Sequence, residues 1–339
     1  MERLRALKFC CLALSFLTGM MDHITGVGDV FMEVLGKKAD QGKEVCMFEA
    51  TQALTMDYIG RAALGIDTSF QNDPNNSFLV TAQRAFREIM TGPFHVLAHL
   101  SKTRMLSSEE VIINTTVLFA AGFETTATTL CYLMFVLGKY PDVQEKVREE
   151  VKRALDDSGS LDYETVTQKL KYLEQVVHET MRIWPAGLTF TTRQAKEDFE
   201  YQGIRYKAGT CIMSPTLQIQ RDERFFPDPM KFDPDRFSEE NEDSFPKIAF
   251  QPFGIGPRNC LGMKLALVEL AYTVARMTQH FRWELGESQK AKIVNKKKSI
   301  SVFDFDQLNA RIDKTSHFVY FGNIQFHVME DINDPQSPP

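Results

Sequence analysis

The sequence predicts a mainly helical α+β protein. Apolar residues recur at helical spacing over long stretches of the first half of the chain, and again from Met263 to Phe281. Short runs with strand character, separated by glycines, appear only after residue 198. The chain contains no internal repeat that would indicate a solenoid. This order, many helices followed by a few hairpins, favours the α+β class.

The N-terminal segment has two interpretations. Three basic residues among the first eight precede an apolar stretch from Phe9 to Met21, which resembles a weak signal sequence or membrane anchor. The stretch is too short and too polar to span a bilayer. An ordinary first helix is therefore the favoured interpretation, and an anchor is the alternative.

The middle of the chain predicts three successive helices. Ser107 and Glu110 form a capping box that opens a long apolar helix from about 108 to 139. Pro141 occupies the favoured first position of the next helix. The third helix extends from about Val166 to Trp184 and ends there because a proline follows. Loop residues gather at 71–77, 156–160 and 239–244.

The strand signals come later. Residues 199–206 and 209–213 predict short strands around glycine-containing turns. Strand-forming residues return at 300–303 and at 317–328. Residues 331–339 have the composition of a disordered tail.

Composition is that of a large globular protein and argues against several classes of function. The chain has 339 residues, 43% of them hydrophobic, which is enough to bury a sizeable core. A net charge of −6 argues against nucleic-acid binding, and the basic run 296–298 is interpreted as a solvated loop. The six cysteines show no paired spacing, which argues against a disulfide framework, a zinc site and covalently attached haem.

The most specific motif surrounds Cys260. This residue belongs to the glycine-rich stretch FGIGPRNCLG at 253–262, directly before the helix predicted from Met263. A helix N-terminus favours an anionic sulfur, and glycines let the backbone approach a flat ligand closely. The motif therefore predicts a thiolate that binds a metal. For an isolated cysteine the alternative is a buried structural residue.

The stretch resembles the haem-ligand loop of the cytochrome P-450 family, the haem-thiolate monooxygenases. The resemblance implies the cytochrome P-450 fold, with helices around a haem and small β-hairpins, and a non-covalently bound haem b. Cys260 would be the proximal thiolate ligand of the iron, which favours O–O cleavage. Arg258 would pair with a haem propionate through its planar guanidinium. The cofactor-binding residues of this loop would be Phe253, Gly254, Gly256, Arg258, Cys260 and Gly262.

The long helix carries a second motif, AGFETT at 121–126. A glycine in mid-helix costs about 1 kcal/mol relative to alanine, so Gly122 requires an explanation. It could allow close approach of a flat cofactor or a close helix crossing, and the neighbouring threonines could simply bond back to the preceding turn. Glu124 and Thr125 match the family's acid-alcohol pair, so the resemblance implies that they deliver protons during oxygen activation.

The third predicted helix carries Glu179 and Arg182, three residues apart. An exposed pair of this kind contributes less than about 1 kcal/mol, which is the ordinary alternative. Residues 232–237 then resemble the family's P-x-R-F segment. The resemblance implies a buried structural cluster of Glu179, Arg182 and Arg236. Breaking such a cluster costs about 3 to 5 kcal/mol because an unpaired charge stays buried.

The resemblance also implies partners. Arg193 lies where the family commonly has a second propionate partner, although an exposed arginine is the alternative. Electrons would come from NADPH through a cytochrome P-450 reductase, and the substrates would be O2 and a small apolar organic molecule. The location would be the endoplasmic reticulum membrane, with association at the membrane surface. The acid-alcohol pair favours a monooxygenase over a peroxide isomerase, which would not need one.

The sequence also departs from the family pattern. The resemblance is good over about 107–285 and looser over 20–78, but neither tryptophan is followed four residues later by arginine, so the family's W-x-x-x-R is absent. Residues 79–106 replace the two long helices that normally roof the substrate pocket. The usual N-terminal membrane helix and first strands are missing too. We therefore expect a shortened product: a fragment, a splice form or an incomplete gene model.

These departures leave two functions open. We expect a weakly apolar segment at 1–21, a single partial cytochrome P-450 domain at 22–330 and a disordered tail at 331–339. The first function is a monooxygenase; the second is a non-catalytic remnant that binds haem or a partner without turnover. A missing roof would leave the distal face open, so we expect weak haem retention and slow turnover from the chain alone.

Overall fold

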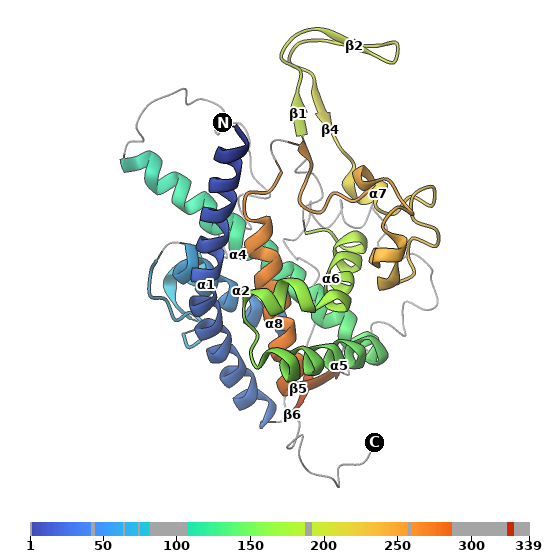
Figure 1. The fold of residues 1–339 in the computed structure, drawn as a ribbon. Coiled ribbons are helices and arrows are strands. Elements are labelled where there is room, and N and C mark those ends of the chain that lie inside the picture. Colours follow the sequence, from blue (N-terminus) through green and yellow to red (C-terminus); the bar gives the residue numbers. More distant parts are fainter. Residues whose placement is uncertain are drawn as a thin grey trace.

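The computed structural model describes residues 2–41, 45–63, 65–73, 75–81, 108–186, 192–256, 259–286 and 324–328. Over these residues the chain is mainly helical, with three small antiparallel strand pairs, so the predicted fold class is confirmed (Figure 1). The helices are α1 (Glu2–Ala39), α2 (Met47–Tyr58), η1 (Ile59–Ala63), α4 (Ser108–Lys139), α5 (Pro141–Ser158), η3 (Thr165–Lys169), α6 (Lys171–Ile183), α7 (Thr216–Ile219), η4 (Pro234–Phe237), η5 (Glu239–Asn241), η6 (Lys247–Ala249) and α8 (Met263–His280).

The described strands form three pairs. Strand β1 (Thr192–Gln194) pairs with β4 (Cys211–Met213), and β2 (Phe199–Tyr201) pairs with β3 (Ile204–Tyr206). Strand β5 (Phe281–Leu285) pairs with β6 (Ile324–Val328). Together β1 to β4 form a long hairpin that extends away from the helices in Figure 1.

Helix α4 is the centre of the fold. It contacts α2, α5, α6, α8 and β5, because residues on most of its circumference are apolar and buried. Within it, Phe119–Lys139 is long and apolar enough to cross a membrane, the one such segment in the described part of the chain. Two thirds of its most apolar window (67%) is buried inside the protein, as is typical of a core helix.

Helix α5 begins and ends as its sequence predicts. Pro141 lies at its first turn, and Gly159 ends it in the left-handed conformation at φ 75°. The buried amide of Gln144 then ties the helix to its neighbours. Its Nε2 donates to Leu137 O at 3.0 Å and to Trp283 O at 2.9 Å, and its Oε1 accepts from Trp283 N at 3.2 Å. This single side chain joins α5 to the end of α4 and to β5.

The third predicted helix is interrupted near its start. Residues 165–169 form the separate π-helix η3, Leu170 is non-helical (φ −98°, ψ 59°), and α6 begins at Lys171. The reason is Glu150 on α5, whose carboxylate accepts from Tyr172 N at 2.6 Å and Leu173 N at 2.9 Å and so caps a new helix start. The predicted end is right, because α6 stops at Ile183 with Trp184 as its C-cap.

The predicted hairpin at 199–206 is present as β2 and β3, with Gln202 and Gly203 at positive φ (49° and 77°) as a type I′ turn requires. Strand β4 lies inside the predicted 209–213, and β6 lies inside the predicted 317–328. Strands β1 and β5 were not predicted, and Phe281 begins β5 instead of ending a helix. Ser107, residues 300–303 and the tail at 331–339 lie outside the described residues.

Helix α8 buries an unusual carboxyl group. The side chain of Glu269 belongs to a residue only 1% exposed, and its Oε1 has no hydrogen-bond partner in the described structure. Burial raises the pKa of Glu269 to about 8. One turn along, Thr273 Oγ1 and Tyr58 OH lie 2.9 Å apart and tie α8 to α2. The core between these helices is therefore partly polar.

Candidate functional site

The Cys260 loop leads into α8. Gly262 is the N-cap of α8 and makes no side-chain cap, so the first backbone N–H groups of the helix, which begin three residues beyond the thiol, have no capping side chain there. Three backbone bonds lie within the loop: Cys260 N donates to Phe253 O at 2.9 Å, Gly254 N to Gln251 O at 3.1 Å and Asn259 N to Gly256 O at 3.1 Å. The left-handed φ of Gly254 (70°) explains the need for glycine there.

The loop presents its thiol outward. Cys260 is exposed, and the apolar Leu261 beside it is 94% exposed. The left-handed Gly256 (φ 77°) has no heavy atom within 4 Å of the place where a Cβ would be. The structure therefore does not support a buried structural cysteine, the alternative that the sequence left open. Arg258 lies outside the described residues.

A stripe of small residues on α4 lies near the start of α8, the helix that follows the Cys260 loop. Ala121 is exposed and Gly122, Thr125 and Thr128 are partly exposed, whereas most other described side chains of this helix are buried. Leu265, in the first turn of α8, packs against the buried cluster that contains Phe119 and Phe123 of α4. The start of α8 and the AGFETT segment are therefore neighbours.

Packing between helices explains Gly122. A Cβ added to Gly122 would lie 2.3 Å from Ile59 Cδ1 and 2.8 Å from Ile59 Cγ1. Such distances are shorter than any ordinary contact, so a larger residue at position 122 would force the buried Ile59 side chain to move or α4 and η1 to separate. Of the two explanations that the sequence left open, the structure supports the close helix crossing.

Glu124 and Thr125 are adjacent but have different surroundings. The Glu124 carboxylate is 4% exposed and accepts from Gln52 Nε2 of α2 at 2.8 Å. Thr125 is partly exposed, and its Oγ1 donates to Ala121 O at 2.7 Å. The threonine therefore makes the bond to the preceding turn that is common in helices. Gln52 was missed in the sequence, because α2 also carries other polar residues and the amide did not stand out among them.

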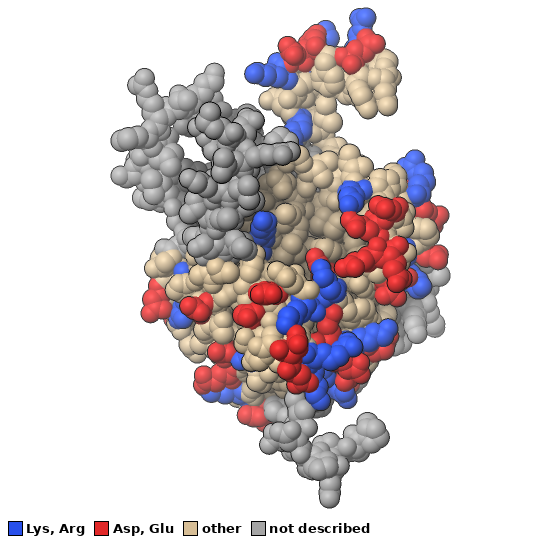
Figure 2. All heavy atoms as spheres, in the orientation of Figure 1, with Lys and Arg blue, Asp and Glu red and all other residues tan. Residues whose placement is uncertain are grey.

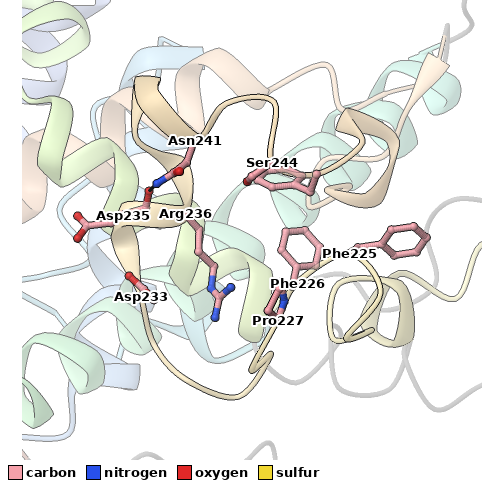
Figure 3. Close-up of a pocket in the computed structure, with 9 residues that line it drawn as sticks. Phe225, Phe226, Pro227, Asp233, Asp235, Arg236, Asn241 and Ser244 are labelled. Atoms are coloured by element: carbon pink, nitrogen blue, oxygen red, sulfur yellow. Dashed lines mark hydrogen bonds between the residues drawn. The ribbon is translucent and has the colours of Figure 1, made fainter.

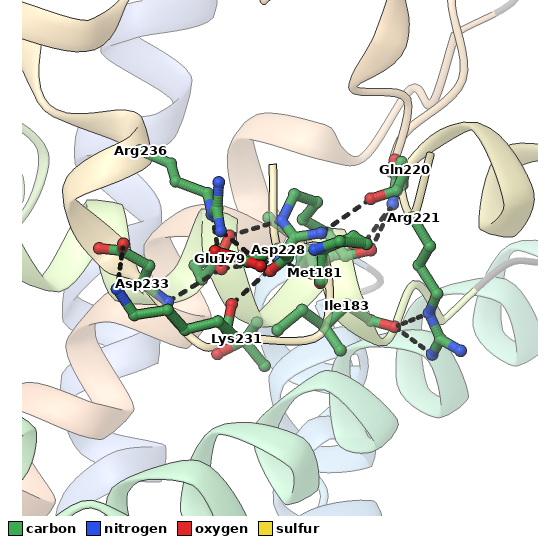
Figure 4. A network of polar contacts seen from close by, with 12 residues as sticks. Glu179, Met181, Ile183, Gln220, Arg221, Asp228, Lys231, Asp233 and Arg236 are labelled. Atoms are coloured by element: carbon green, nitrogen blue, oxygen red, sulfur yellow. Dashed lines mark hydrogen bonds and ion pairs between the residues drawn. The ribbon is translucent and has the colours of Figure 1, made fainter. Parts of the chain in front are cut away.

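Glu179 forms ion pairs with both Arg182 and Arg236, and Figure 4 shows Glu179 and Arg236 side by side. The side chains of Glu179 and Arg182 are both 0% exposed, and Arg182 donates to Glu179 Oε2 at 2.6 Å and to Glu179 Oε1 at 2.8 Å. Asp233 N donates to Glu179 Oε1 at 3.0 Å, and Arg236 Nε lies 3.5 Å from the same oxygen. Burial raises the pKa of Glu179, and the bonds from Arg182 act in the opposite direction. The pair is thus not the exposed ion pair of the alternative interpretation.

Two further side chains, not predicted from the sequence, cap the C-terminus of α6 in the same view. Gln220 Nε2 donates to Met181 O at 3.1 Å and Arg182 O at 3.0 Å, and Arg221 Nε donates to Ile183 O at 3.0 Å. These carbonyls are among the last of the helix, which have no partner within it. The sequence gives no local signal for this capping because about 38 residues separate the partners.

Arg193 connects the long hairpin to the Cys260 loop. It lies on β1, is exposed, and donates from Nη2 to Ile255 O at 2.9 Å. The structure therefore places Arg193 at the loop that carries Cys260. On the face shown in Figure 2, the surface between the hairpin and the helices has few charged side chains.

A pocket of about 280 Å³ lies elsewhere, beside the Glu179 cluster (Figure 3). Phe225, Phe226 and Phe245 line one part of it, and Asp233, Asp235 and Arg236 line another. The lining includes neither Cys260 nor the residues of the α4 stripe. We therefore do not include this pocket in the candidate functional site.

Comparison with known proteins identifies the family of this chain and several relatives. A family model described as Cytochrome P450 matches residues 95–304, more than half of the chain. Cytochrome P450 3A17 of Cavia porcellus is 29% identical over 321 residues, which cover 77% of this chain and 63% of the relative. Cytochrome P450 3A7 of Homo sapiens is 27% identical over 342 residues, which cover 84% and 68%. The chain thus spans about 63% of the length of the guinea pig relative.

Proposed function

Because this chain belongs to the cytochrome P450 family, we propose that it is a haem-thiolate monooxygenase that inserts one oxygen atom of O2 into an apolar organic substrate. Electrons reach it from NADPH through a reductase. The single observation that supports this most is the exposed thiol of Cys260, presented before the N-terminus of α8 by a loop with two left-handed glycines. The family resemblance also suggests a position at the endoplasmic reticulum membrane surface.

The described residues fit a haem. Beside the thiol, Leu261 offers an apolar surface that is 94% exposed, and there is open space around Gly256 and Gly262. The α4 stripe is made of small, uncharged residues, two of which, Thr125 and Thr128, carry a hydroxyl. A thiolate with mostly apolar, small-residue surroundings is the donor set that suits a flat, mostly apolar ring with a central iron.

Haem supplies the chemistry of O2 activation when it is bound. The protein's own residues have narrower tasks. Cys260 would hold the iron through its thiolate, and the loop glycines would let the backbone approach the ring. Arg193 and Arg258 would bind the propionates, to which a planar guanidinium is well suited.

Thr125 and Glu124 have complementary roles in this proposal. The Thr125 hydroxyl on the exposed side of α4 moves a proton toward the ring, and it can do so once its bond to Ala121 O is exchanged. The Glu124 side chain, held by Gln52 on α2, would relay protons to Thr125 from behind. Proton delivery then depends on a rotation of one or both side chains, since Glu124 is buried.

Glu179, Arg182 and Arg236 have a structural role. They fix the segment 228–237 against α6, since Arg182 also donates to Pro229 O at 2.7 Å and Arg236 to Asp228 O at 3.1 Å. We also place residues 22–330 in a single domain around the haem. The Glu179 cluster would hold its part of this domain in place whether or not haem is bound.

A spectroscopic experiment tests the proposal. The purified chain is reconstituted with haem, reduced and exposed to carbon monoxide, and the Soret band is recorded. We expect the red-shifted band of thiolate ligation. Cys260→His should move the band to the position of a histidine-ligated haem, whereas Cys211→Ser, which changes another exposed cysteine, should leave it in place.

The outcomes separate two errors. An unchanged band in Cys260→His would refute the ligand assignment. A parent chain that binds no haem under these conditions would refute the proposed cofactor. A parent that shows the thiolate band but oxidises no apolar substrate with added reductase would support haem binding without turnover.

A further inference from the structure

A pair of buried amides connects α6 to the start of the Cys260 loop. Gln220 is 0% exposed and Gln251 is 5% exposed, and Gln251 N donates to Gln220 Oε1 at 2.7 Å. Gln220 Nε2 meanwhile donates to the carbonyls of Met181 and Arg182 at the end of α6. The side chain of Gln220 therefore spans the distance between the helix end and the segment that enters the loop.

The second amide continues this connection. Gln251 O accepts from Gly254 N at 3.1 Å and forms the first turn of the loop. Its side chain is held on both sides, because Nε2 donates to Ile248 O at 2.6 Å and Oε1 accepts from Ser214 Oγ at 3.0 Å. Two residues further, Phe253 O accepts from Cys260 N at 2.9 Å. A short series of hydrogen bonds thus leads from α6 to the backbone of the thiol residue.

The ion pair fixes the other end of the series. Arg182 Nη1 donates to Gln220 O at 2.8 Å while Nε and Nη2 bind Glu179. Gln220 consequently has its backbone held by the ion pair and its side chain held by the helix end. A buried amide with so many partners has little rotational freedom. The fixed position of Gln220 therefore also fixes the position of the Gln251 backbone, which donates to it.

We propose that Gln220 and Gln251 are positioning residues that fix the Cys260 loop relative to α6. The inference rests on the proposed function only where it concerns haem, because the loop geometry exists without it. Neither residue touches the thiol. They act through the backbone, by holding the entry of the loop at one distance from the helix.

The test compares two buried glutamines. Gln220→Leu keeps similar volume but leaves Gln251 N and two helix carbonyls without their partner. Gln144→Leu is the matched control, because Gln144 is also buried and also bridges two carbonyls and one backbone N–H, but between α5, α4 and β5. Gln144 Oε1 additionally accepts from Arg148 Nη2 at 3.3 Å, within α5 and away from the loop. Both variants should lower the free energy of unfolding in urea by a comparable amount. A difference between them in the amide exchange of the Cys260 loop would therefore report on the position of that loop and not on overall stability.

Amide hydrogen exchange of residues 251–262 is measured in the full chain, relative to exchange in the core of α8. We expect loop exchange to rise about tenfold in Gln220→Leu, since one buried amide has lost its partner, and to stay at the parental ratio in Gln144→Leu. Ser214→Ala, a milder change at the edge of the series, should raise it about threefold. In haem-loaded protein the thiolate-type carbonyl band should weaken in Gln220→Leu and persist in Gln144→Leu.

Two results would overturn the inference. One is equal loop exchange in Gln220→Leu and Gln144→Leu, which would mean that Gln220 is only a stability residue. The other is unprotected loop amides in the parent chain. If the parent lacks the thiolate band, the proposed function fails, and loop exchange still decides the positioning role. Should Gln220→Leu not fold, Ser214→Ala with the same readouts takes its place.

Discussion

The buried Glu269 makes stability depend on pH in a direction that can be worked out. In the unfolded chain its carboxyl has an ordinary pKa of 4.5, whereas burial in the folded protein raises the pKa to about 8. Between these values the unfolded chain has lost the proton and the folded chain keeps it. Unfolding then releases one proton, so the free energy of unfolding falls as pH rises. The contribution of protonated Glu269 to the free energy of unfolding is fully present below pH 4.5 and is lost as pH rises through 8.

The size of the effect follows from the slope. One proton released corresponds to about 1.36 kcal/mol per pH unit, so the whole interval amounts to roughly 5 kcal/mol and the range from pH 5 to 7.5 to about 3 kcal/mol. Glu269→Gln removes the titration. The amide has its own cost in a buried site, but that cost does not change with pH.

Urea unfolding followed by far-UV circular dichroism at pH 5, 6, 7 and 7.5 measures the slope. We expect the parent to lose about 3 kcal/mol more than Glu269→Gln over this range. Glu239→Gln, at an exposed position on η5, is the control and should follow the parent. Parallel curves for the parent and Glu269→Gln would refute the reasoning, because Glu269 would then be ionised or paired in the folded state.

Two further changes test the α4 stripe. Thr125→Ala should leave haem content unchanged and divert reducing equivalents to hydrogen peroxide, which is measured as less product per NADPH consumed. Thr129→Ala removes the same kind of bond to the preceding turn, one turn later, and should keep the parental yield of product per NADPH. An equal yield in the two variants would contradict the proton role of Thr125. Gly122→Ala should lower the free energy of unfolding by about 1 to 3 kcal/mol because its Cβ overlaps Ile59. Ile59→Ala, as background, should abolish most of that loss, and an undiminished loss would show that the contact is not its cause.

The parts predictable from sequence were those with local causes. Helix α4 was predicted at 108–139 and observed at Ser108–Lys139, and α8 begins at the predicted Met263, because apolar periodicity and the flanking residues act within each segment. The β2–β3 hairpin followed from the turn at Gly203. In each case the determining residues are neighbours in the chain.

The missed features depend on contacts between distant segments. The break at Leu170 comes from Glu150 on another helix, and β5 exists because Phe281 pairs with Val328. At the site, the motif alone located the thiol, yet Gln52 and Gln220 gave no clear signal of their own. Their partners, Glu124 and the end of α6, lie 72 and about 38 residues away.

The long hairpin has a mechanical consequence. It contacts the Cys260 loop on both sides: Arg193 on β1 donates to Ile255 O, and Ser214, directly after β4, donates to Gln251 Oε1. Strands β1 and β4 pair only with each other among the described strands, so each has a backbone edge that no described strand occupies. A strand from another molecule that paired along either edge could displace the hairpin. Arg193 and Ser214 would then transmit that displacement to the loop that carries Cys260.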